Sequence, residues 1–330
     1  MTIHQQKNSE TNIFNINTEK EFEGAALKLF ENQANNNPVY KQYITYLNIN
    51  PADISGVKEI PCMPVGLFKS HEIKTGEFIA ENRFESSGTE GSGKSVHYIK
   101  NIDLYRQSVI KGFNHFYGDS GRFAFFALLP SYIERKNASL VYMAKTLMEQ
   151  NPDGCGGFYL KKNDSLKEKI KKAEKIGYQT ILLGVSFALS DLAKNPDIDL
   201  RNTIIIETGG MKGMQKEIIR DELHNYLRKK LHPKAIHSEY GMTEMLSQAY
   251  KQETEGFMSP PWLKILIRDM YDPGKYVQQG QHGLINIIDL ANTHSCAFLQ
   301  TNDTGKITPD GFTVSGRLDH SDIRGCNLMV

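Results

Sequence analysis

Residues 86–94 read Ser86-Ser87-Gly88-Thr89-Glu90-Gly91-Ser92-Gly93-Lys94, and the predicted fold depends on how this glycine-rich stretch is interpreted. Glycine adopts backbone angles that a Cβ atom would forbid, so such a loop can wrap its N–H groups around phosphate oxygens. The hydroxyl groups add hydrogen-bond donors, and Lys94 adds a positive charge for the same anion. The stretch therefore predicts a loop that binds the phosphates of ATP.

Gly88 to Ser95 also matches G-x-x-x-x-G-K-[ST], the Walker A pattern of P-loop NTPases. That pattern requires a buried strand before the loop and a helix that begins at its lysine. Residues 80–85 are too polar for a buried central strand, and Val96-His97-Tyr98-Ile99 is β-branched and aromatic, which favours a strand. The best Walker B candidate, 203–206, is followed by Glu207 instead of aspartate. The flanking residues therefore favour a loop followed by a strand, with the P-loop NTPase as an alternative.

Length and composition exclude several classes of protein. The 330 residues are enough for two or three domains, and a net charge of +1 gives no sign of nucleic-acid binding. No apolar run approaches the roughly 18 residues of a membrane span, and the N-terminus lacks the apolar core of a signal peptide. The cysteines are far apart and predict reduced thiols and a cytoplasmic location; they are Cys62, Cys155, Cys296 and Cys326.

The hydrophobic pattern predicts strands that alternate with helices, which indicates βαβ units and a mostly parallel sheet. Expected helices are 19–34, 137–150, 165–176, 187–194 and 214–231, and expected buried strands are 123–129, 180–185 and 203–206, followed by 235–237. Beyond Pro260-Pro261, short strands are expected at 263–267, 284–289, 297–300 and 312–314, separated by glycine and Asn-Asp turns. We therefore predict an α/β core at 1–260 and a β-rich subdomain at 261–330.

Two polar segments are expected where predicted strands end, at Glu207-Thr208-Gly209-Gly210 and at residues 238–244. Ligands of open parallel sheets bind outside the carboxyl ends of the strands. A purine requires a flat ring, and a hard cation that bridges phosphates requires a carboxylate. Taken alone, however, Tyr240 would be a core side chain and Glu244 a surface charge.

These motifs, in this order, resemble those of the adenylate-forming superfamily, which includes acyl-CoA ligases, luciferases and peptide-synthetase adenylation domains. The resemblance implies that Tyr240 stacks on adenine, that Thr243 contacts the α-phosphate and that Glu244 ligates Mg²⁺. The implied ATP-binding residues are Ser86, Ser87, Gly88, Thr89, Gly91, Gly209, Gly210, Ser238, Glu239, Tyr240, Gly241, Asp303 and Arg317. Lys94, Thr243 and Glu244 belong to the implied catalytic set.

Two further segments extend the resemblance towards the C-terminus. Residues 300–303 are similar to the T-G-D segment that binds the ribose, with Asn302 where glycine is usual, and 316–319 are similar to the G-R-x-D hinge. The superfamily then continues into a mobile domain of about 100 residues that carries a catalytic lysine, whereas this sequence ends at Val330. The resemblance therefore implies an N-terminal-type fold that lacks the mobile lid and its part of the CoA site.

Residues 22–38, 64–69, 130–135 and 324–328 together resemble the LuxE-type acyl-protein synthetases of bacterial bioluminescence, over nearly the whole chain. In that family a fatty acid is activated as acyl-AMP, moved to a cysteine near the C-terminus and passed to a partner reductase. Cys326 matches that cysteine by position. Arg324 nearby would lower its pKa, and the thiolate is the nucleophile that attacks a mixed anhydride.

The expected function is therefore ATP- and Mg²⁺-dependent activation of a carboxylic acid, a fatty acid by the resemblance, with transfer to Cys326. Tyr132 and Phe187 are predicted to line the acid pocket, and the expected partner is an acyl-accepting protein such as a reductase or carrier. Three alternatives stay open: acyl transfer to CoA or a carrier protein, a P-loop NTPase, and a non-catalytic nucleotide-binding protein. The preferred acid, the final acceptor, the pathway and the oligomeric state are not predicted.

Overall fold

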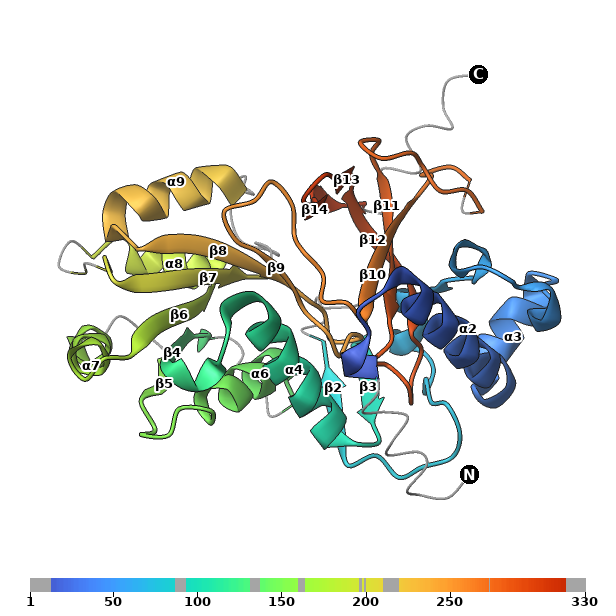
Figure 1. The fold of residues 1–330 in the computed structure, drawn as a ribbon, viewed down its shortest axis with the longest axis horizontal. Helices are drawn as coiled ribbons and strands as arrows, with labels where there is room; N and C mark the ends of the chain where they lie inside the picture. The colour runs from blue at the N-terminus through green and yellow to red at the C-terminus, as the bar shows by residue number, and fades with distance from the viewer. Residues whose placement is uncertain are drawn as a thin grey trace.

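Two β-sheets with helices packed against them lie side by side in the computed structural model (Figure 1). The structure describes residues 13–86, 93–130, 137–159, 164–195, 198, 200–209, 220–272 and 274–318. Within these ranges, no helix combines the length and the apolar character needed to cross a membrane.

The first sheet has six strands in the order β5-β4-β6-β7-β8-β9. Its strands are β4 (Phe123–Leu128), β5 (Gly156–Tyr159), β6 (Gln179–Val185), β7 (Thr203–Thr208), β8 (Ala235–Tyr240) and β9 (Ala249–Lys251). All pairs are parallel except β8 with β9. Strands β4 and β7 are buried along their whole length, as expected for a parallel sheet that is covered on both faces.

Helices cover both faces of this sheet (Figure 1). They are α4 (Ile102–Tyr117) and α6 (Ser139–Met148) on one face and α8 (Ser186–Leu192) and α9 (Arg220–Leu231) on the other, with α7 (Asp164–Lys175) against β4, β5 and β6. The predicted α/β architecture is therefore confirmed.

The second sheet has the order β1-β12-β11-β10, with β15 paired to β12. Its strands are β1 (Met63–Pro64), β10 (Leu263–Arg268), β11 (Gly283–Asp289), β12 (Phe298–Gly305) and β15 (Gly316–Arg317), and a small hairpin of β13 (Ile307–Thr308) and β14 (Gly311–Phe312) lies next to it. Only β1 runs parallel to its neighbour, so this part of the chain is mainly antiparallel.

The N-terminal helices α2 (Glu19–Asn36) and α3 (Pro38–Tyr46) pack against this second sheet. Buried Gln33 donates a hydrogen bond to the carbonyl of Asn292 and accepts one from the N–H of Ala297, both at 2.9 Å. Helix α2 begins at a capping box formed by Thr18 and Glu21, as its sequence pattern favours. The short 3₁₀ turns are Ile13–Asn15, Pro51–Asp53, Val57–Glu59, Val65–Lys69 and Ser120–Arg122.

The glycine-rich stretch connects two antiparallel strands, β2 (Asn82–Glu85) and β3 (Val96–Ile99). At its base, the N–H of Ser86 donates to the Ser95 carbonyl and the N–H of Ser95 donates to the Ser86 hydroxyl, both at 3.0 Å. Because a strand follows Lys94 instead of a helix, the P-loop alternative is wrong. Four predicted phosphate-loop residues lie outside the described part of the chain: Ser87, Gly88, Thr89 and Gly91.

Some predicted element boundaries are wrong. Strand β7 continues through Thr208 and β8 through Tyr240, so the polar segments begin inside the strands and do not follow them. The predicted Asn-Asp turn near Asp303 lies within β12. In each case the polar side chains find partners inside the fold, which lets the strand continue. The domain boundary near 260 stays a prediction; no regular element lies between Lys251 and Leu263 among the described residues.

Candidate active site

Three predicted nucleotide-binding residues meet where the two sheets approach each other. Tyr240 ends β8, Asp303 lies in β12, and Arg317 lies opposite Asp303 in β15. The Tyr240 hydroxyl donates to Asp303 Oδ2 at 2.9 Å, and Arg317 Nε donates to Asp303 Oδ1 at 2.9 Å. Burial, with the nearby Asp303 charge, raises the pKa of Tyr240, so its phenol stays protonated and donates to the carboxylate. Asp303 therefore joins both sheets at this point.

Two phenylalanines pack against the ring of Tyr240. The ring centroids of Phe257 and Phe312 lie 5.9 and 5.5 Å from that of Tyr240. The guanidinium of Arg220, at the described start of α9, lies 5.1 Å from the centroid of Phe257. Gly311 has a φ of +133°, and a Cβ there would collide with the Phe257 carbonyl, so the β13–β14 hairpin can approach this closely only with glycine. The rings fix the orientation of Tyr240 by packing.

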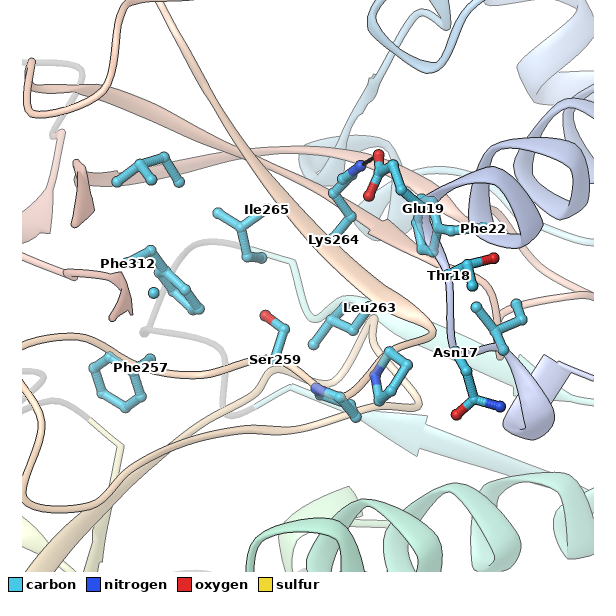
Figure 2. A pocket seen from close by; sticks show the side chains of 15 residues that line it. Asn17, Thr18, Glu19, Phe22, Phe257, Ser259, Leu263, Lys264, Ile265 and Phe312 are labelled. Carbon is cyan, nitrogen blue, oxygen red and sulfur yellow. Dashed lines mark hydrogen bonds and ion pairs between the residues drawn. The ribbon is translucent and has the colours of Figure 1, made fainter. Parts of the chain in front are cut away.

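Phe257 and Phe312 also line a groove of about 350 Å³ (Figure 2). Figure 2 shows the start of α2 on one side of this groove and Phe257 and Phe312 on the other. The chain from Ser259 into β10 lies between them, with the Lys264–Glu19 ion pair at the edge. None of the predicted site residues that the structure describes lines it. The groove is therefore a separate feature from the convergence at Tyr240.

A buried polar network holds the end of β7. Glu207 accepts a hydrogen bond from the Ser186 hydroxyl at 2.6 Å and from Arg220 Nε at 3.3 Å, and His224 Nε2 lies 3.9 Å away. Burial alone would raise the pKa of Glu207, but His224, Arg220 and Ser186 together hold it below its usual range. The Ser186 hydroxyl also lies 3.0 Å from the carbonyl of Gly209, the predicted adenine-side glycine, whose φ is +73°. The network fixes the backbone at the end of β7, where the sequence predicts the adenine side of the site.

Glu239 lies on the opposite face of β8 from Tyr240, because successive side chains of a strand alternate. It accepts a hydrogen bond from the Thr208 hydroxyl. Burial raises the pKa of Glu239 to about 7, and the neighbouring Glu207 charge acts in the same direction. A Cβ on Gly241 would lie 2.5 Å from Glu239 Oε1, so glycine leaves room for this carboxyl at the start of the predicted phosphate-contacting loop.

The side chain of Lys94, in the hairpin between β2 and β3, extends into solvent. Its Nζ lies 3.5 Å from Glu85 Oε2, and 60% of its side chain is exposed. Asn137 Nδ2 donates to the other Glu85 oxygen at 3.0 Å and, as the largest contribution, lowers the pKa of Glu85. An exposed ion pair of this kind is weak, so little free energy is needed to separate Lys94 from Glu85.

The loop that carries Thr243 and Glu244 is held through its main chain. The Thr243 carbonyl accepts a hydrogen bond from His97 Nδ1 at 2.8 Å, and the Glu244 carbonyl accepts one from Asn292 Nδ2 at 2.7 Å. The described residues contain no cluster of three or more His, Cys, Asp or Glu side chains that could hold a metal ion. Mg²⁺ is commonly bound through one or two carboxylates together with substrate phosphates, so a single carboxylate at Glu244 is compatible with that ion.

The other predicted site residues are buried, half-buried or outside the described part of the chain. Ser238 is fully buried with its hydroxyl 3.4 Å from His224 Nε2, and Phe187 is half-buried in α8 against the core. Gly210, Tyr132 and Cys326 lie outside the described residues. The role of every predicted site residue stays a prediction.

Four residues that pack against the ring of Tyr240 or hold the carbonyls of Thr243 and Glu244 were not predicted from the sequence. They are His97, Asn292, Phe257 and Phe312. Only His97 had a usable signal: in the alternating Val96-His97-Tyr98-Ile99 strand it shares a face with Ile99, which predicts a buried histidine in need of a partner.

Comparison with solved structures shows which known fold this chain has. The open conformation of 2-hydroxyisobutyryl-CoA ligase in complex with 2-HIB-AMP and CoA is similar with a TM-score of 0.69 at 11% identity, over 92% of this chain and 70% of that one. ATP-bound MatB from Rhodopseudomonas palustris has a TM-score of 0.50 at 18% identity, over 71% of this chain and 47% of that one. The chain thus spans about half the length of MatB. Its fold is that of the adenylate-forming ligases.

A match to a family model identifies the family of this chain. The model of the LuxE acyl-protein synthetase family matches residues 12–330, and the chain belongs to that family. It is accordingly an ATP-dependent enzyme of the acyl-adenylate-forming type, and the predicted family is confirmed. No curated protein matches the sequence significantly.

Proposed function

We propose that the chain activates a fatty acid as acyl-AMP at the junction of the two sheets and transfers the acyl group to Cys326. The observation that carries this proposal is the convergence on Asp303, which receives both Tyr240 from the first sheet and Arg317 from β15. Membership of the LuxE family supports the acyl-protein outcome over transfer to CoA. Scattered cysteines without paired spacing support a reducing, cytoplasmic location.

In the proposed complex, adenine lies against the ring of Tyr240 and the ribose hydroxyls donate to Asp303. An ionised carboxylate offers about four lone-pair sites, so Asp303 can accept from the ribose while it keeps its two protein donors. Gly209 supplies backbone without a side chain beside the base.

The phosphates in this proposal lie between the hairpin and the loop at Thr243. The hairpin N–H groups and Lys94 bind the β- and γ-phosphates, and the Thr243 hydroxyl donates to the α-phosphate. A Mg²⁺ ion held by Glu244 would neutralise phosphate charge when bound. An oxygen of the fatty acid carboxylate attacks the α-phosphorus, the bond to the bridging oxygen breaks and pyrophosphate leaves with the electron pair. The protein contributes by positioning the reactants and stabilising charge.

In the second step the Cys326 thiolate attacks the acyl carbon of acyl-AMP. A carbon–sulfur bond forms, the bond between the acyl carbon and the phosphate oxygen breaks, and AMP leaves with the electron pair. The thiol proton passes to solvent before the attack. The thioester is then a substrate for an acyl-accepting protein such as a reductase or carrier.

Two measurements test the proposal. Pyrophosphate exchange into ATP is measured over saturated fatty acids of increasing length and over aromatic acids, and we expect exchange that depends on a fatty acid. A labelled fatty acid then traps the thioester: Cys326→Ser should lose the protein-bound label and keep the exchange, whereas the matched control Cys155→Ser should keep both. Label that persists in Cys326→Ser, or acyl product that forms only with CoA, would overturn the assignment of Cys326.

A further inference from the structure

A buried histidine joins two parts of the proposed active site that are far apart in the sequence. His97 is the second residue of β3, the strand that leaves the phosphate hairpin, and only 1% of it is exposed. Its Nδ1 lies 2.8 Å from the carbonyl oxygen of Thr243. A carbonyl can only accept, so Nδ1 carries the proton and donates it to this bond.

The protonation state of His97 decides which ring nitrogen can donate in this hydrogen bond. Burial lowers the pKa of His97 to about 4, despite the opposing effects of its hydrogen bonds to the Thr243 carbonyl and to the Asn292 side chain. The imidazole is therefore neutral near pH 7, with one N–H, and that N–H is used for the Thr243 carbonyl. Phe68 contacts the ring edge-on with centroids 5.8 Å apart, which fixes the plane of the imidazole. The ring is held with one tautomer and one orientation.

The same loop is held from the second sheet. Asn292 Nδ2 donates to the Glu244 carbonyl, and Asp289 Oδ2 accepts from the N–H groups of Leu246 and Ser247 at 2.8 and 3.0 Å. Asn292 and Asp289 are 1% and 0% exposed. The loop after β8 is thus fixed at its C-terminal side by the second sheet, and His97 fixes it to β3, the strand that follows the hairpin.

We propose that His97 is a positioning residue that sets the distance between the hairpin and the Thr243 loop, and so the alignment of the α-phosphate with the β- and γ-phosphates. The inference rests on the proposed function, because it assigns phosphates to both segments. In-line attack at the α-phosphorus depends on this alignment, and a displacement of about 1 Å costs on the order of 100-fold in rate. Loss of the hydrogen bond would therefore lower kcat much more than it raises KM for ATP.

Two substitutions of similar size and polarity separate this role from simple packing. The amide nitrogen of His97→Asn lies close to the position of Nδ1, whereas that of His97→Gln lies close to the position of Nε2. We expect pyrophosphate exchange in His97→Asn to stay within a few-fold of the wild type, and kcat in His97→Gln to fall by roughly 10- to 100-fold. Melting temperatures of the two variants are measured in parallel.

Two outcomes would overturn the inference: equal kcat in the two variants, or losses of kcat that follow the melting temperatures. If both variants unfold, ¹⁵N NMR of the wild-type imidazole decides, because the inference requires the proton on Nδ1 and a proton on Nε2 would contradict it. Failure of the proposed function gives a different result, since the wild type would then show no exchange that depends on a carboxylic acid.

Discussion

Replacement of Glu239 by glutamine should change how the stability of the protein depends on pH. The Glu239 carboxyl is buried, accepts from the Thr208 hydroxyl and has a pKa of about 7 in the folded chain, against 4.5 for an unperturbed glutamate. Between these two values the folded chain holds a proton that the unfolded chain has lost. The free energy of unfolding therefore falls as the pH rises through this window, because the folded state must finally bury a charge.

The magnitude follows from the two pKa values. A group that titrates near 4.5 when unfolded and near 7 when folded lowers the free energy of unfolding by roughly 2.5 kcal/mol between pH 5 and pH 8. Glutamine keeps the oxygen that accepts from Thr208 but cannot ionise. Titrating groups that do not interact with Glu239 act equally in both chains, including His97 and His237, whose pKa values burial lowers to about 4.

Urea unfolding of the wild type and of Glu239→Gln between pH 5 and pH 8 measures this directly. The difference in unfolding free energy between the two chains should grow in favour of glutamine by about 2.5 kcal/mol over this range. Glu31→Gln, at an exposed position of α2, is the matched control and should follow the wild type. Parallel pH profiles of the wild type and Glu239→Gln would refute the assigned ionisation.

Three further substitutions test the geometry of the site. Lys94→Ala should lower exchange by about 100- to 1000-fold with an unchanged melting temperature, because a charge at the phosphates is lost from an exposed side chain; a rate near that of the wild type would contradict its role. Asp303→Asn should raise KM for ATP by roughly 10- to 100-fold, since Tyr240 and Arg317 lose a charged acceptor; an unchanged KM would remove Asp303 from the nucleotide site. Asp289→Asn should lower the free energy of unfolding by about 2–4 kcal/mol, because this buried carboxylate accepts from three main-chain N–H groups and a hydroxyl; unfolding in urea at the wild-type midpoint would refute this.

The strands and helices that have a clear pattern in the local sequence were predicted well. The apolar runs at β4, β6 and β7 are long enough to mark buried strands, and the β-branched residues after Lys94 separate a hairpin from a P-loop. Helix α4 is absent from the prediction, although Asn101 provides an N-cap for it.

Sequence patterns could not predict the interactions between segments that are far apart in the chain. The strands β7 and β8 continue into Glu207 and Glu239 because each buried carboxyl finds a hydroxyl donor, and no local pattern reveals those partners. The pairing of β1 with β12 joins segments far apart in the chain, and two residues carry no strand signal of their own. For the site, motifs predicted Tyr240 and Asp303, but nothing near Asn292 indicates that it holds the Glu244 carbonyl.

In the proposed reaction, a carboxylate oxygen becomes bonded to the α-phosphorus of ATP. A fatty acid labelled with ¹⁸O in its carboxylate, incubated with the enzyme and Mg·ATP until the thioester forms, tests this by mass spectrometry of the released nucleotide. We predict AMP that carries one ¹⁸O atom, because the bond to the acyl carbon breaks when the thiolate attacks. Unlabelled AMP, or ADP and orthophosphate as the only products, would contradict the account.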